Sequence, residues 1–168
     1  MRARVLGAII ASVVLVIAFA PPATASSEGQ VAEKLFNKIN NKRVKLHNLD
    51  RLEGWDVIVD EATQHSEYQA QHGEISHDGF TARANRIQSK GTGINNVCEN
   101  VAYVSGINDL RTIVRTFYRG WDKSPPHHAC LFDEDFHATW AGVGVAKVGA
   151  STWYATFIAV LDSSPAQP

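Results

Sequence analysis

Apolar residues recur along four segments of the chain at the spacing of amphipathic helices. These segments cover residues 29–43, 56–72, 79–90 and 108–122. The last is the clearest, because a single apolar stripe follows it: Leu110, Ile113, Val114, Phe117, Tyr118 and Trp121. Ser26 or Ser27 can cap the first helix, and Gly73 and Gly91 stand where the second and third helices should end.

Other segments alternate with the period of a strand. Asn100–Val104 is predicted to be a short strand that opens from a loop containing Glu99, and Gly142–Val148 and Ser151–Val160 are predicted to form a β-hairpin that turns at Gly149. Ser124 and the two prolines after it end the fourth helix and begin a very short one. This order of elements predicts an α+β fold, with helices on both faces of a mostly antiparallel sheet.

The first residues have the features of a secretory signal peptide. Arg2 and Arg4 precede an apolar run from Val5 to Ala20, and Ala23-Thr24-Ala25 is an A-x-A cleavage site. The run is shorter than the ~20 residues that span a bilayer. We therefore expect a signal peptide over residues 1–25, a secreted, extracellular domain over 26–162 without a membrane span, and a disordered polar tail over 163–168.

Composition limits the partners of this domain. The chain has 168 residues, with 16 basic and 17 acidic side chains, and without residues 1–25 its net charge becomes −3. Such a balance argues against nucleic acid or an anionic membrane as a partner. The chain has two cysteines, Cys98 and Cys130, and export favours a disulfide between them. The bond would stabilise the fold by about 3 to 4 kcal/mol and bring Glu99 near His127.

Seven histidines provide the main candidates for chemistry, and they are His47, His65, His72, His77, His127, His128 and His137. His65 and His72 lie seven residues apart on the second helix, amid glutamines, and are interpreted as solvated. His77 follows that helix in a loop that can direct its imidazole inward. Adjacent residues project in different directions, so Ser76, His77 and Asp78 cannot act as a catalytic triad.

Two cysteine-based sites are weaker alternatives. Export opposes a cysteine nucleophile served by His127, because the thiol would have to stay reduced. A structural zinc site that combines both cysteines with two histidines lacks the usual paired spacing of zinc modules. An open site formed by His77, Glu99 and His127 remains. Two imidazoles and one carboxylate are a zinc-ligand set that leaves a position for water, yet the same residues could form a buried hydrogen-bonded cluster.

The order of several short motifs resembles the CAP superfamily, which comprises cysteine-rich secretory proteins, antigen 5 and pathogenesis-related 1 proteins, in its short bacterial form. The matching positions are Phe36, Ile39, Asn40, Arg43, Trp55-Asp56, Ala62, Ser76-His77-Asp78-Gly79-Phe80, Arg83, Cys98-Glu99-Asn100-Val101-Ala102, Trp121, Ser124-Pro125-Pro126-His127 and Gly142-Val143-Gly144-Val145-Ala146. The resemblance implies a three-layer α-β-α sandwich with a central surface cavity lined by two histidines and two acidic residues.

By motif position, His77, Glu99 and His127 correspond to three of these four residues. The fourth, an acidic residue, has no clear match, since residues 79–97 contain none, and Asp78 is the nearest candidate. His128 could compete with His127 for the inward position. The two cysteines stand where the family often has glycine and asparagine beside the cavity, which supports their pairing.

Three functions follow as hypotheses. The first is a secreted CAP-domain protein whose cavity binds a divalent metal, Zn²⁺ or another, through His77, His127 and Glu99, and which also takes a lipid, sterol or other small hydrophobic ligand. The second is a metal-dependent hydrolase in which Glu99 or Asp78 is the general base for a zinc-bound water. The third is a structural or interaction domain without ligand. The sequence does not choose between binding and catalysis.

Overall fold

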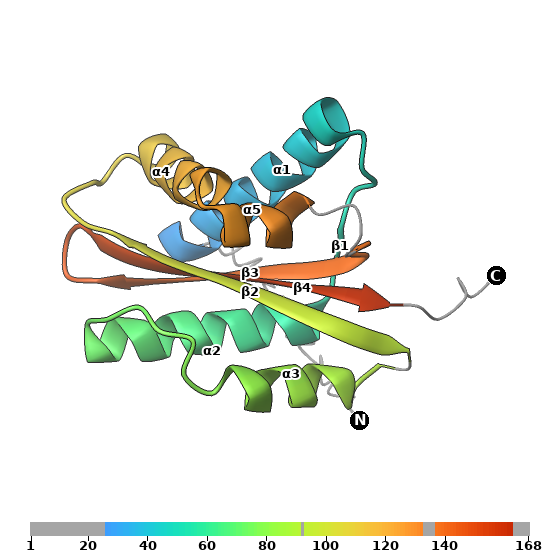
Figure 1. The fold of residues 1–168 in the computed structure, drawn as a ribbon. Coiled ribbons are helices and arrows are strands. Elements are labelled where there is room, and N and C mark those ends of the chain that lie inside the picture. The colour runs from blue at the N-terminus through green and yellow to red at the C-terminus, as the bar shows by residue number, and fades with distance from the viewer. Residues whose placement is uncertain (1–25, 92, 133–136, 163–168) are drawn as a thin grey trace, which may run out of the picture.

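Helices cover both faces of a four-stranded sheet in the computed structural model, which describes residues 26–91, 93–132 and 137–162 (Figure 1). The elements are α1 (Ser27–His47), β1 (Glu53–Gly54), α2 (Asp56–His72), α3 (Phe80–Gln88), β2 (Ile94–Val104), α4 (Leu110–Lys123), α5 (Pro125–Phe132), β3 (Trp140–Val148) and β4 (Thr152–Asp162). Helices α1, α4 and α5 lie on one face, and α2 and α3 on the other. The predicted α+β three-layer sandwich is confirmed. The predicted signal peptide and tail lie outside the described residues.

The sheet is mostly antiparallel, as predicted. Its strand order is β1-β3-β4-β2, and β1 pairs with β3 in parallel while the other pairs are antiparallel. Strands β3 and β4 form the expected hairpin, and Gly149 adopts a positive φ of 60° in its turn. Strand β4 lies between two partners, and every residue from 153 to 160 is buried. The two-residue strand β1 was not predicted.

Strand β2 is longer than its sequence pattern indicated. It begins at Ile94 rather than Asn100, so Glu99 lies inside the strand and not in a preceding loop. Residues 95–100 are mostly polar and have weak strand propensity. Pairing with β4, which places Glu99 opposite Ile158 and Asn100 opposite Phe157, overrides that propensity. The sheet therefore positions Glu99 rigidly.

Helix α1 is also longer than predicted at both ends. Ser26 caps it, since its Oγ accepts a hydrogen bond from the Gly29 amide at 3.1 Å. The helix continues through His47, and Asn48 ends it in the left-handed conformation with φ 52°. The remaining helices begin and end within two residues of their predicted limits. In α5, Pro125 occupies the first helical position, where a missing amide hydrogen has no cost.

Two glycines of β3 explain how closely α2 lies on the sheet. A Cβ atom at Gly142 would come within 2.6 Å of the Val59 amide nitrogen, and one at Gly144 would overlap the Ala62 and Thr63 backbone. Because α2 lies so close to β3, Ser66 Oγ can donate a hydrogen bond to the Gly144 carbonyl at 3.0 Å. The Gly-x-Gly motif thus sets the distance between α2 and the sheet.

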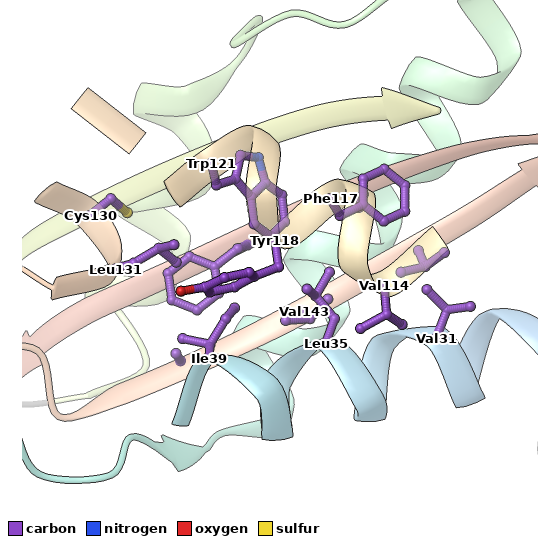
Figure 2. Close-up of a cluster of buried hydrophobic side chains, with 14 of the residues drawn as sticks. Val31, Leu35, Ile39, Val114, Phe117, Tyr118, Trp121, Cys130, Leu131 and Val143 are labelled. Carbon is purple, nitrogen blue, oxygen red and sulfur yellow. The ribbon is translucent and has the colours of Figure 1, made fainter. Parts of the chain in front are cut away.

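The main hydrophobic core fills the space between the sheet and the α1–α4–α5 layer. Figure 2 shows Leu35 and Ile39 of α1 facing Val114 and Tyr118 of α4. Burial of each large side chain contributes about 1.5 to 3 kcal/mol. A smaller cluster lies under α2 and α3, and it contains Ile58, Ala62, Ile87, Ile158 and Val160. Both helical layers are thereby fixed on the sheet.

A buried arginine joins the end of α1 to the segment around α5. The Arg43 guanidinium donates to the backbone carbonyls of Asp50 at 2.9 Å, Leu131 at 2.6 Å and Ala138 at 3.4 Å. Burial lowers the pKa of Arg43. These bonds hold the C-terminal end of α5, whose first turn carries His127.

Candidate functional site

Glu99 is the centre of a polar cluster on the α2–α3 side of β2. Its side chain is only 1% exposed. The Arg83 guanidinium from α3 donates to both carboxylate oxygens, with Nε–Oε2 and Nη2–Oε1 distances of 2.8 Å. Arg83 Nη1 also donates to the Asp78 carbonyl at 2.6 Å. This bidentate pair neutralises the buried carboxylate and fixes its orientation.

His77 lies in the loop between α2 and α3 and contacts the same carboxylate. Its Nδ1 is 2.9 Å from Glu99 Oε1. An ionised carboxylate only accepts hydrogen bonds, so Nδ1 must carry the ring proton. In the neutral ring the lone pair then lies on Nε2, and solvent can reach it because the side chain is 52% exposed. His77 is an oriented, accessible imidazole.

His127 approaches His77 from α5. Its backbone carbonyl accepts a hydrogen bond from Asn100 Nδ2 at 2.8 Å, which ties the first turn of α5 to β2. Burial lowers the pKa of His127, and the nearby His77 lowers it further. His127 is thus a neutral, half-buried imidazole near pH 7, with a free lone pair on one ring nitrogen.

The disulfide holds α5 beside this strand. Cys98 of β2 and Cys130 of α5 are bonded, with a Cα–Cα distance of 5.7 Å. The predicted pairing is present in the structure. Cys98 is adjacent to Glu99, and Cys130 lies one helical turn after His127. The disulfide therefore holds the backbone beside both residues, while its sulfur atoms are neither ligands nor reacting groups.

His65 was interpreted as solvated, and the structure contradicts this. The side chain is buried on α2, its Nε2 lies 2.7 Å from the Ser76 carbonyl and 3.9 Å from Glu99 Oε1, and burial lowers its pKa. The contact with Ser76 holds the start of the His77 loop. The signal was present in the sequence, because His65 shares the helical face of Ile58, Ala62 and Gln69. His72, by contrast, is exposed as expected.

Two of the predicted cavity residues lie apart from the His77–Glu99–His127 cluster. The Asp78 side chain is exposed, and only its backbone carbonyl contacts Arg83. His128 Nδ1 lies 3.3 Å from Asp122 Oδ1, and its ring packs against His47 and Phe132. Helical geometry directs successive side chains about 100° apart, so His127 and His128 diverge.

His77, Glu99 and His127 were expected to form a three-ligand metal set, and the structure gives Glu99 other partners. Across the part of the chain that the structure describes, no three His, Cys, Asp or Glu side chains gather to hold a metal ion. Both Glu99 oxygens accept from Arg83, and Oε1 also contacts His77. Arg83, which the sequence suggested only as a motif residue, thus makes Glu99 a partner of His77 rather than a free ligand.

A groove elsewhere on the molecule has a mostly apolar lining. It has a volume of about 750 Å³ and lies between α1 and α2 beside β3. Its apolar walls come from Ala32, Phe36, Val59, Val143 and Val145. His77, Glu99 and His127 do not line it. Any hydrophobic ligand held there would therefore bind away from the histidines.

No protein-family model and no curated protein matches the chain. Its fold is nevertheless similar to solved structures. An outer surface protein of Borrelia burgdorferi matches with a TM-score of 0.63 and 23% identity, over 78% of this chain and 92% of that one.

Two further structures carry family descriptions. An extracellular protein of Bacillus anthracis that contains an SCP domain matches with a TM-score of 0.59 and 27% identity, and a cysteine-rich secretory protein of Staphylococcus aureus with 0.54 and 21%. The matches cover 78% and 77% of this chain but only 41% and 38% of those proteins. The α-β-α fold and the likeness to an SCP domain support the resemblance to the CAP superfamily that the order of the motifs indicated.

Proposed function

We propose that this chain is an exported CAP-domain protein that binds a divalent metal ion between His77 and His127. Export is supported by the Cys98–Cys130 disulfide, a bond typical of oxidising compartments. The similar proteins are described as outer surface or extracellular. Within the described residues, no helix has the length and apolarity to cross a bilayer.

The hydrogen bond from His77 Nδ1 to Glu99 carries the metal-binding proposal. Histidines that bind metals generally donate their other ring nitrogen to a carboxylate, which fixes the tautomer and makes the ligand more basic. His77 has this arrangement, and Arg83 fixes the carboxylate in turn. His77 Nε2 and one nitrogen of His127 are the two proposed ligands.

The donor set fits a borderline metal such as Zn²⁺ or Cu²⁺, because neutral imidazole is a preferred ligand of both. Two protein ligands leave the other coordination positions to water, so the site is expected to be weaker than a closed structural site. When bound, Zn²⁺ would supply a Lewis acid to an oxygen ligand. This chain's contribution is to orient His77 through Glu99 and to favour the neutral form of His127 through burial.

The same geometry favours binding over hydrolysis. A general base needs an oxygen within reach of the water that it deprotonates. Both Glu99 oxygens already accept from Arg83, and the cluster buries them. Glu99 therefore positions His77 and is poorly placed as a base.

Calorimetric titration with ZnCl₂ tests the proposal. Wild-type protein and the His72→Ala control, which removes an exposed histidine outside the cluster, should bind one ion with equal affinity. His77→Ala and His127→Ala should each weaken binding at least tenfold. Equal binding by all four proteins would refute the proposal.

The apolar groove supports a second candidate function, binding of a neutral lipid such as a sterol. Its volume lies in the range of small-molecule sites. Three glutamates and one lysine, Lys147, line it, and this excess of negative charge disfavours an anionic lipid. Ala32→Trp should fill the groove and abolish binding of a fluorescent sterol. Ala82→Trp, on the exposed face of α3, is the matched control. Equal sterol binding by both variants would contradict this function.

A further inference from the structure

A second groove has a strongly cationic lining. It lies between α1 and α4, with a volume of about 750 Å³. Six of its lining residues are basic, and they are Lys34, Lys38, Lys42, Lys45, Arg111 and Arg115. Asp109 is the one acidic residue of the lining, and its carboxylate already caps α4 by accepting from the Thr112 amide at 2.8 Å. Six of the 16 basic residues of a chain with net charge −1 therefore line this one groove.

The basic residues follow a regular arrangement. Lys34, Lys38 and Lys42 recur every four residues along α1, which places the Cα atoms of successive lysines about 6 Å apart along the helix axis. Arg111 and Arg115 repeat the spacing on α4. Helices α1 and α4 lie side by side on the same face of the sheet (Figure 1) and share the main core, so the two rows keep a fixed separation.

Several of these cations are available to a ligand. Lys34, Lys45, Arg111 and Arg115 are exposed. Among the described residues, no carboxylate forms a salt bridge with any of the four lysines. Lys38 is held over the Tyr118 ring, with its Nζ 5.0 Å from the ring centroid. An anionic ligand would therefore neutralise the positive charge that these side chains leave in the groove.

The shape and composition of the groove define the ligand further. A concave channel suits a linear chain better than a flat membrane surface. Proteins that hold single-stranded nucleic acids combine basic grooves with aromatic side chains on which bases stack. The lining of this groove contains no aromatic residue. We propose that it binds a linear polyphosphodiester without bases, in which short polyol spacers repeat the charge at the spacing of the lysines.

This inference does not depend on metal binding, because none of the histidine cluster lines the groove. It also refines the argument from net charge. The net charge of the whole chain disfavours polyanions as a class. The local positive charge between α1 and α4 nevertheless favours a polyanion that is narrow, flexible and free of bases.

Fluorescence anisotropy with a labelled poly(glycerol phosphate) chain tests the proposal. Lys34→Gln combined with Arg115→Gln removes two exposed groove cations. Each contact with a flexible strand contributes about 0.7 to the slope of log K against log salt, so the double variant should lose roughly 25-fold in affinity at about 0.1 M salt. Lys90→Gln combined with Lys123→Gln, which removes two exposed cations elsewhere, should bind like wild type.

Three outcomes would overturn the proposal. They are absence of binding by wild-type protein, equal weakening in both double variants, and binding of poly(dT) as tight as that of the base-free polymer. The last would identify a nucleic-acid groove. Zinc titration of the same double variants should match wild type, which separates this surface from the histidine site.

Discussion

The buried ion pair between Arg83 and Glu99 offers a quantitative test of the site's architecture. In Arg83→Met, the Glu99 carboxylate would lose two charge-assisted hydrogen bonds of 2.8 Å while remaining 1% exposed. Removal of one partner from a buried pair costs about 3 to 5 kcal/mol, because the other charge stays desolvated. Arg83→Met should therefore lower the free energy of unfolding by about that amount.

A second arginine on the same helix provides the control. Arg86 donates to both oxygens of Glu61 at 2.7 and 2.6 Å, so its geometry matches that of Arg83. Its side chain, however, is 54% exposed, compared with 7% for Arg83. Because solvent screens the Arg86 pair, Arg86→Met should cost about 1 kcal/mol or less.

Urea unfolding followed by tryptophan fluorescence would measure both effects. Glu99→Gln completes a double-mutant cycle with Arg83→Met. Since the double variant buries neither charge, its loss should be smaller than the sum of the single losses by at least about 2 kcal/mol. Equal costs for the Arg83 and Arg86 variants, or additive losses in the cycle, would refute the argument that Glu99 is buried and held by Arg83.

Three further predictions concern the fold and its response to pH. Gly144→Ala should destabilise the protein by about 3 kcal/mol or more, because α2 would have to move off the sheet. Gly120→Ala, on the open face of α4, should be neutral or stabilise the protein by up to about 1 kcal/mol. Thermal melts that show equal effects of the two substitutions would contradict this prediction. Burial lowers the pKa of His65, so the unfolded chain binds more protons below about pH 6.5 and stability should fall as the pH drops from 7 to 5. His65→Gln should reduce that slope by up to about 1.4 kcal/mol per pH unit, and an unchanged slope in urea titrations would count against a buried neutral His65. Replacement of Cys98 and Cys130 by alanine should cost about 3 to 4 kcal/mol, and an unaltered urea midpoint would show that the disulfide does not stabilise the fold.

Sequence periodicity was sufficient to predict the helices and the hairpin. Their apolar stripes are strong, and the caps at Ser26 and Gly73 are local signals. Strand β2 was underestimated because pairing with β4, not local propensity, extends it to Ile94. No local pattern reports such a long-range constraint.

The candidate site was predictable in its members but not in its arrangement. Motif order pointed to His77, Glu99 and His127. The role of Arg83 depends on how α3 lies against β2, and the contact of His65 with the Ser76 carbonyl depends on how the loop after α2 folds back on that helix. Both are consequences of packing between separate elements, which periodicity within one element does not report. The sequence could therefore suggest Glu99 as a metal ligand, while the structure pairs it with Arg83.

Long-range ¹H–¹⁵N correlation spectra of the histidine rings during zinc titration test the metal site most directly. We predict that zinc shifts the Nε2 resonance of His77 and one ring nitrogen of His127. His77 Nδ1 should stay protonated against Glu99, and the resonances of His65 and His72 should not move. Zinc that leaves His77 and His127 unchanged, or that shifts the exposed His72 equally, would contradict the account.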